Sequence, residues 1–99
     1  MRYAARVDEN QPEIVTALRA CGATVWIIGQ PVDLLVGYRG FNYLLEIKDG
    51  KKTASRRKHT PAQVEFFKTW KGQKATVKTQ DEALRAIGAI KNGTTTTRN

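Results

Sequence analysis

The stretch that decides the fold is residues 31–48, PVDLLVGYRGFNYLLEIK, in which two apolar runs flank a turn-like sequence around Arg39-Gly40. Aliphatic, β-branched and aromatic residues fill both runs, as is typical of β-strands, and an X-Gly pair suits a two-residue hairpin turn. The stretch therefore predicts a β-hairpin with strands at residues 32–36 and 43–48. The nearly continuous apolar character of these strands predicts a sheet whose two faces are both covered by helices.

Three charged residues interrupt these apolar strands, namely Asp33, Glu46 and Lys48. Side chains alternate along a strand, so Glu46 and Lys48 are expected on one face. A two-residue turn at Arg39-Gly40 pairs residues whose numbers add up to 79, which places Asp33 directly opposite Glu46. Two carboxylates at that spacing destabilise a sheet unless a cation lies between them. The pattern therefore predicts a site for a hard divalent cation.

The ligands of the predicted cation site are all oxygens. Carboxylate oxygens, with no cluster of cysteine or histidine nearby, favour Mg²⁺ or Mn²⁺ over Zn²⁺. The backbone carbonyl of Ile47 is expected to add a further ligand. Such a cation activates a bound water and neutralises charge on a phosphate, while Lys48 would orient or deprotonate the water or stabilise the transition state. The alternative is that Glu46 and Lys48 form a surface ion pair.

The flanking sequence predicts helices and strands in the order αβββαβα. The remaining elements are expected at about residues 9–21 (helix), 24–28 (strand), 60–71 (helix), 75–78 (strand) and 79–90 (helix). Asp8 or Asn10 is expected to cap the first helix, and Thr60-Pro61-Ala62-Gln63 has the sequence of a helix start. Residues 1–92 are therefore predicted to form one α/β domain, and residues 93–99 a disordered tail.

The positive charge of the chain is concentrated in one third of it. The 99 residues carry a formal charge of +8, and residues 48–78 contain ten Lys and Arg against two acids. Such an excess favours nucleic acid as the partner, although a solvated charged face is the alternative. The residues expected to hold a DNA backbone are Lys51, Lys52, Arg56, Arg57, Lys58, Lys68 and Lys71.

Other classes of protein are excluded by composition. A single cysteine, Cys21, rules out a disulfide scaffold, and Cys21 itself is expected to be a small core residue. The longest apolar stretch, residues 23–28, is far shorter than the ~20 residues that cross a bilayer. We therefore expect no membrane partner and a cytoplasmic location. Four aromatic residues are expected in the core rather than in base stacking: Trp26, Phe66, Phe67 and Trp70.

Together these motifs resemble the PD-(D/E)XK nuclease superfamily, and most nearly its virus-type replication–repair nuclease (VRR-NUC) branch. The matching segments are Asn10-Gln11, Leu18-Arg19, Gly22, Val32-Asp33-Leu34-Leu35, Leu44-Leu45-Glu46-Ile47-Lys48 and Thr60-Pro61-Ala62-Gln63. The resemblance implies a restriction-endonuclease-like αβββαβ core, with a mixed central sheet flanked by helices, plus a C-terminal helix. It also implies a metal-dependent DNA endonuclease that hydrolyses phosphodiester bonds.

The resemblance further implies a set of catalytic residues, which are Asp33, Glu46, Lys48, Gln63 and Glu13. Gln63 has an alternative use in the helix cap itself. For the acid from the first helix, Asp8 and Glu9 are alternatives to Glu13. Stand-alone relatives act as homodimers on branched DNA, so a structure-specific enzyme is expected, in the host cytoplasm if a phage encodes it. The rival hypothesis is a basic nucleic-acid-binding module without catalysis.

Overall fold

A computed structural model describes residues 9–48 and 60–91 of the chain. The expected tail at residues 93–99 and the basic segment at residues 51–58 lie outside the described residues. The elements are α1 (Gln11–Ala20), β1 (Thr24–Ile27), β2 (Leu34–Tyr38), β3 (Phe41–Ile47), α2 (Pro61–Thr69), β4 (Lys74–Val77) and α3 (Gln80–Ala86). Their order is the αβββαβα order predicted from the sequence.

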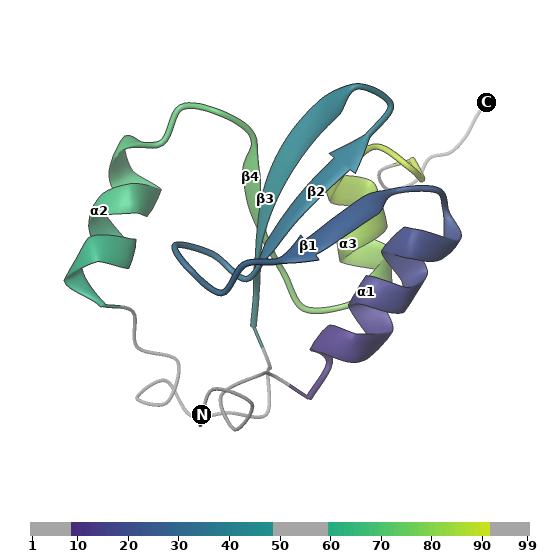
Figure 1. The fold of residues 1–99 in the computed structure, drawn as a ribbon, viewed down its shortest axis with the longest axis horizontal. Helices are drawn as coiled ribbons and strands as arrows, with labels where there is room; N and C mark the ends of the chain where they lie inside the picture. The colour runs from purple at the N-terminus through teal and green to yellow at the C-terminus, as the bar shows by residue number, and fades with distance from the viewer. Residues whose placement is uncertain (1–8, 49–59, 92–99) are drawn as a thin grey trace.

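The four strands form one mixed sheet in the order β1-β2-β3-β4. Strands β1, β2 and β3 are antiparallel neighbours, and β4 joins β3 in parallel after the connection that contains α2. The helices are divided between the two faces, with α1 and α3 on one side and α2 on the other (Figure 1). The protein is therefore an α/β fold with an open four-stranded sheet, which confirms the predicted class.

The β2–β3 hairpin has the predicted turn. Arg39 and Gly40 both have positive φ, 52° and 85°, a combination that gives the two flanking strands their native twist. Tyr38 pairs with Phe41, and further along the ladder Leu34 pairs with Leu45. These pairs have the register that the Arg39-Gly40 turn predicts. The hairpin is thus set by local turn chemistry.

The hydrophobic core fills one side of the sheet only. Alternate residues of the strands point at α1 and α3. Leu34 of β2 and its partner Leu45 of β3 are completely buried on this side. The main members of this core are Ile14, Leu18, Val25, Leu34, Val36, Leu45, Ile47, Val77, Ala83 and Ile87. Cys21 is half-buried and packs against this core, as expected.

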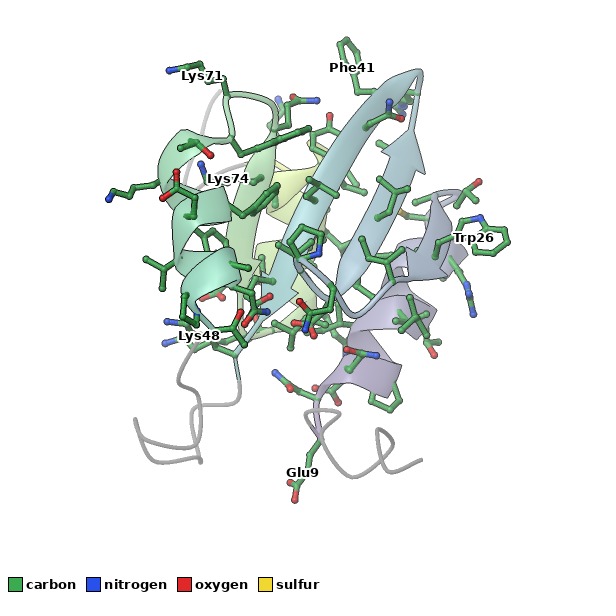
Figure 2. The ribbon with its side chains drawn as sticks, turned by 60° about the vertical axis from the view of Figure 1, so that its left-hand side comes forward. Glu9, Trp26, Phe41, Lys48, Lys71 and Lys74 are labelled. Carbon is green, nitrogen blue, oxygen red and sulfur yellow. The ribbon has the colours of Figure 1, made fainter. Side chains whose placement is uncertain are left out.

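The face toward α2 is only partly covered. This corrects the prediction that helices cover both faces of the sheet, and with it the prediction that Trp26 and Trp70 lie in the core. Trp26 is 68% exposed and Leu35 is 38% exposed, and Trp26 projects away from the sheet (Figure 2). Trp26 is therefore not a core residue, and Trp70 is 42% exposed. The reason is that Trp26 alternates with the buried Val25 on β1, on the face opposite α1 and α3. Phe66 instead packs on its own helix, edge-on against Phe67 and stacked on Trp70.

Several element boundaries differ from the predicted ones because of local backbone chemistry. The last helix ends at Ala86 rather than near residue 90, since Gly88 follows with φ +80° and turns the chain. β2 begins at Leu34, two residues later than predicted, so Asp33 precedes the strand. In the residues that the structure describes, no helix combines the length and apolarity needed to cross a membrane.

Candidate active site

Asp33 is held by hydrogen bonds to its backbone and to its side chain. The N–H groups of Ile28 and Gly29 donate to its carbonyl oxygen at 2.9 and 3.2 Å. The Ile47 N–H donates to carboxylate Oδ2 at 2.7 Å. Since Leu34 pairs with Leu45, continuing the register by one step sets Asp33 opposite Glu46. The carboxylate therefore lies against the end of β3, where the turn arithmetic expects it.

Glu46 is the one buried acid among the described residues, with 8% of its surface exposed. Its neighbours Leu45 and Ile47 point into the core, so Glu46 lies on the opposite face of the sheet. Burying a carboxylate beside a second acid costs free energy unless cations or hydrogen bonds balance the charge. The arrangement is one that a cation would stabilise.

Lys48 directly follows β3, and its backbone is fixed by two neighbours. Its N–H donates to the Val77 carbonyl at 2.9 Å, and its own carbonyl accepts from Asn10 Nδ2 at 3.1 Å. The Lys48 side chain is half-buried and shares the face of Glu46 by strand alternation. The three charged residues singled out in the sequence are thus brought together at one end of the sheet.

The Asn10 side chain does not cap the first helix, as the sequence predicts, but makes other hydrogen bonds. Its side chain makes no cap hydrogen bond to α1. Instead Nδ2 donates to the carbonyls of both Lys48 and Lys78, at 3.1 and 2.6 Å, and so joins the ends of β3 and β4. We call this contact the Asn10 clamp. The only sequence signal for it is the Asn10-Gln11 pair among the matching segments.

Gln63 makes the helix cap considered as its alternative use, and it makes one further contact toward the candidate site. Its Oε1 accepts from the Thr60 N–H at 3.0 Å while the Thr60 hydroxyl accepts from the Gln63 N–H at 3.1 Å, which is a complete capping box. Its Nε2 donates to the Pro31 carbonyl at 3.2 Å. Pro31 lies two residues before Asp33, so Gln63 ties α2 to the segment that carries the first carboxylate.

Of the three acids considered for the first helix, the two that the structure describes do not form a metal-binding group with this pair. Glu13 is exposed and lines a hollow between α1 and α3, together with Gln80 and Leu84, on the core side of the sheet. Glu9 is exposed and points away from the body of the protein (Figure 2). Asp8 lies outside the described residues. The Asn10 clamp brings the start of α1 to the end of β3.

The basic residues expected to bind DNA are divided. Lys68 and Lys71 are exposed, and Lys71 lies at the end of the sheet remote from Lys48 (Figure 2). The other five, Lys51, Lys52, Arg56, Arg57 and Lys58, lie outside the described residues. Lys78, which follows β4, was not singled out in the sequence, but it lies beside Lys48.

The donor set fits a hard divalent cation in chemistry, and it supplies two carboxylates rather than three or more. Asp33, Glu46 and the Ile47 carbonyl offer oxygen ligands, which Mg²⁺ and Mn²⁺ prefer. Within residues 9–48 and 60–91, no group of three or more His, Cys, Asp or Glu side chains is arranged to hold a metal ion. Mg²⁺ ordinarily keeps several waters and takes one or two carboxylates, so a two-carboxylate site is consistent with it.

Comparison with known proteins adds no further constraint. No family model matches the chain, and no curated protein and no solved structure matches it. The resemblance to PD-(D/E)XK nucleases therefore stays a prediction, and it depends on the residues described above.

Proposed function

We propose that the chain is a metal-dependent DNA endonuclease with a restriction-endonuclease-like core of the VRR-NUC type. The observation that carries the proposal is the hairpin register, which brings Asp33 opposite Glu46, two residues before Lys48, with the Asp33 carboxylate accepting from the Ile47 N–H. A binding module without catalysis has no use for two adjacent carboxylates on a sheet, one of them buried. A phosphodiesterase has a direct use for them.

Asp33, Glu46 and the Ile47 carbonyl would hold the ion, Mg²⁺ or Mn²⁺. When bound, such an ion lowers the pKa of a water ligand and offsets charge that develops on the phosphate. Lys48 is set on the same face as Glu46, where its ammonium would orient the attacking water or stabilise the charged transition state. Gln63 is a positioning residue in this scheme, because it acts through Pro31.

The substrate is proposed to be DNA, with branched structures preferred and a homodimer as the active form. The charge supports a polyanionic substrate, since the surplus of eight positive charges lies in residues 48–78, which begin at the proposed catalytic lysine. The preference for branched DNA and the dimer come from the family resemblance.

The test is a cleavage assay with labelled linear, nicked, flapped and four-way DNA, in Mg²⁺, in Mn²⁺ and in EDTA. We expect cleavage that depends on the metal and is lost in Asp33→Asn, Glu46→Gln and Lys48→Ala. Losses of about 100-fold or more are expected, because each group acts on developing charge. Glu65→Gln, an exposed acid of α2, is the matched control and should cleave like the wild type.

Two results would contradict the nuclease proposal. One is a wild-type protein that cleaves none of the four substrates in either metal. The other is full activity in Lys48→Ala. Tight binding of DNA without cleavage would favour the basic binding module instead.

A further inference from the structure

A hollow of about 710 Å³ lies at the free edge of β4, next to Lys48. Three basic side chains line it, Lys48, Lys78 and Arg85, against one acid, Glu82. Thr76 contributes a hydroxyl, and small side chains such as Ala86 leave room beside the strand. The lining is therefore positive overall, and its volume is in the range of small-molecule binding sites.

Lys78 belongs to this hollow and to the candidate active site. Glu46 pairs with Thr76 and Ile47 with Val77, so one more step of the parallel register sets Lys78 beside Lys48. Residues paired in a sheet share a face, so Lys78 and Lys48 follow Thr76 and Glu46 on the face of the carboxylates. Two ammonium groups at neighbouring strand ends repel each other, and an anion between them relieves that repulsion.

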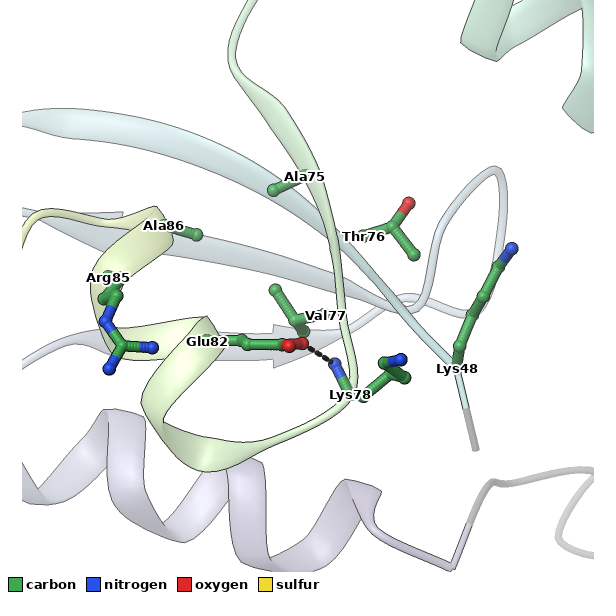
Figure 3. A pocket seen from close by; sticks show the side chains of 8 residues that line it. All are labelled: Lys48, Ala75, Thr76, Val77, Lys78, Glu82, Arg85 and Ala86. Carbon is green, nitrogen blue, oxygen red and sulfur yellow. Dashed lines mark hydrogen bonds between the residues drawn. The ribbon is translucent and has the colours of Figure 1, made fainter. Parts of the chain in front are cut away.

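The backbone of Lys78 is fixed on both sides while its side chain is left available. Its N–H donates to Glu82 Oε1 at 2.6 Å, and its carbonyl accepts from the Asn10 clamp at 2.6 Å. Among the described residues, no hydrogen bond of its ammonium is present, and the side chain is exposed. Glu82 points its carboxylate at the Lys78 backbone (Figure 3), so this acid is used within the fold.

Arg85 extends the positive lining to the other side of β4. Figure 3 shows Thr76 and Lys48 on one side of the strand and Arg85 on the other. The Nε of Arg85 is buried and has no hydrogen-bond partner within the part of the chain that the structure describes. Because this Nε is buried, a phosphate in the hollow would meet the remaining N–H groups of the half-buried guanidinium, whose planar fork suits phosphate oxygens.

We infer that this hollow is a phosphate-binding track, in which Lys78 and Arg85 hold successive phosphates of a nucleic-acid strand that crosses the edge of β4 past Lys48. The inference rests on the proposed function for the identity of the anion as DNA. It adds to that function a second contact region, since Lys78 and Arg85 lie outside the residues expected to bind DNA. Lys78 places a cation beside the reacting phosphate, and Arg85 holds the strand one step away.

The experiment measures binding of fluorescein-labelled DNA by anisotropy in EDTA, so that cleavage does not enter. Lys78→Gln and Arg85→Gln are each expected to weaken binding several-fold and to lower the slope of log affinity against log salt by about one. Lys91→Gln removes the same charge at an exposed position outside the hollow and should bind like the wild type. Thermal melts of all variants show that the fold is retained.

A variant that is expected to strengthen DNA binding separates an effect of charge from a loss of structure. Glu82→Gln keeps an oxygen acceptor for the Lys78 N–H but removes the negative charge from the hollow. It should therefore bind DNA more tightly than the wild type. Binding by Lys78→Gln and Arg85→Gln that equals that of Lys91→Gln would overturn the inference.

The hollow could also bind free inorganic phosphate instead of the phosphates of DNA. A competition experiment distinguishes these two ligands. Inorganic phosphate, titrated at constant ionic strength, should displace DNA no better than chloride. Saturable phosphate binding that Lys78→Gln abolishes, with DNA binding unchanged, would overturn the assignment to DNA. If DNA binds through the hollow but is not cleaved in Mg²⁺, the proposed nuclease fails while the track stands.

Discussion

At the scale of single residues, the candidate site depends on side chains that each hold a backbone group. Asp33 accepts from the Ile47 N–H, Asn10 donates to the Lys48 carbonyl, and Gln63 donates to the Pro31 carbonyl. Hydrogen bonds of this kind contribute about 1 kcal/mol each to stability. Their larger effect here is on geometry, because they fix the ends of the segments that carry the charged residues.

Gln63 allows the cap and the site to be tested separately. Gln63→Glu keeps a side-chain oxygen as acceptor for the Thr60 N–H, but its carboxylate has no donor for the Pro31 carbonyl. We expect this variant to melt close to the wild type and to cleave about tenfold or more slowly. The reason is that a small misplacement of reacting groups lowers the rate strongly. The measurement is a thermal melt beside a single-turnover cleavage assay.

Thr60→Ala is the reciprocal control for Gln63. It removes the cap acceptor, which costs about 1 kcal/mol, and leaves the Pro31 contact in place. Its melting temperature should fall while its cleavage rate at low temperature changes little. A Gln63→Glu protein with the wild-type cleavage rate would reduce Gln63 to a helix cap.

At the scale of elements, the β2–β3 hairpin is the unit that the sequence predicts best. Turn type depends on two residues, and Arg39 with Gly40 determines the pairing of every residue along both strands. The facing of Asp33 and Glu46 follows from that pairing. By contrast, the exposure of Trp26 depends on what covers the far face of the sheet, and α2, a segment distant in the sequence, buries none of its own residues.

The same limit explains the misplaced first-helix acid and the overlooked clamp. Helical spacing indicates which residues share a side of α1, but it does not indicate which side faces the sheet ends. Glu13, preferred over Asp8 and Glu9 in the sequence, instead lines the hollow between α1 and α3. Asn10 fits a helix cap equally well, and its partners Lys48 and Lys78 are distant residues whose carbonyls no local pattern reveals.

The turn itself can be tested with two glycines of the hairpin. Gly40 has φ +85°, so Gly40→Ala is expected to destabilise the protein by about 1 kcal/mol, although nothing lies within 4 Å of the added Cβ. Gly37 has equally open space and no positive φ, so Gly37→Ala should leave stability unchanged or raise it. Urea denaturation measures both, and equal effects of the two substitutions would contradict the turn assignment.

At the scale of the whole molecule, the sheet has one closed face and one open face. The closed face carries the stability of the fold, because its side chains are almost completely removed from water. The open face carries Glu46 and, further out, the exposed Trp26. The candidate site and the hydrophobic core thus lie on opposite sides of the same strands.

Substitutions of two adjacent leucines of β2 test the difference in stability between the closed face and the open face. Leu34 is fully buried and Leu35 is 38% exposed. Leu34→Ala should cost about 2–5 kcal/mol, and Leu35→Ala should cost clearly less, since it leaves no enclosed cavity. Equilibrium denaturation of the two variants checks this, and equal losses would mean that the open face is covered, as a homodimer through that face would do.

The Asn10 clamp has a consequence for when the site comes into existence. It joins residues 68 positions apart in the sequence, whereas the hairpin that carries Asp33 and Glu46 is formed by neighbouring segments. Closing so long a loop costs more entropy than closing a short turn, so we expect the clamp to form after the hairpin. During synthesis of the chain, the two carboxylates can face each other as soon as β3 has emerged. We expect Lys48 to acquire its fixed place only when β4 and Lys78 have followed. In a growing chain, the two acids of the candidate site would therefore face each other before Lys48 is fixed beside them.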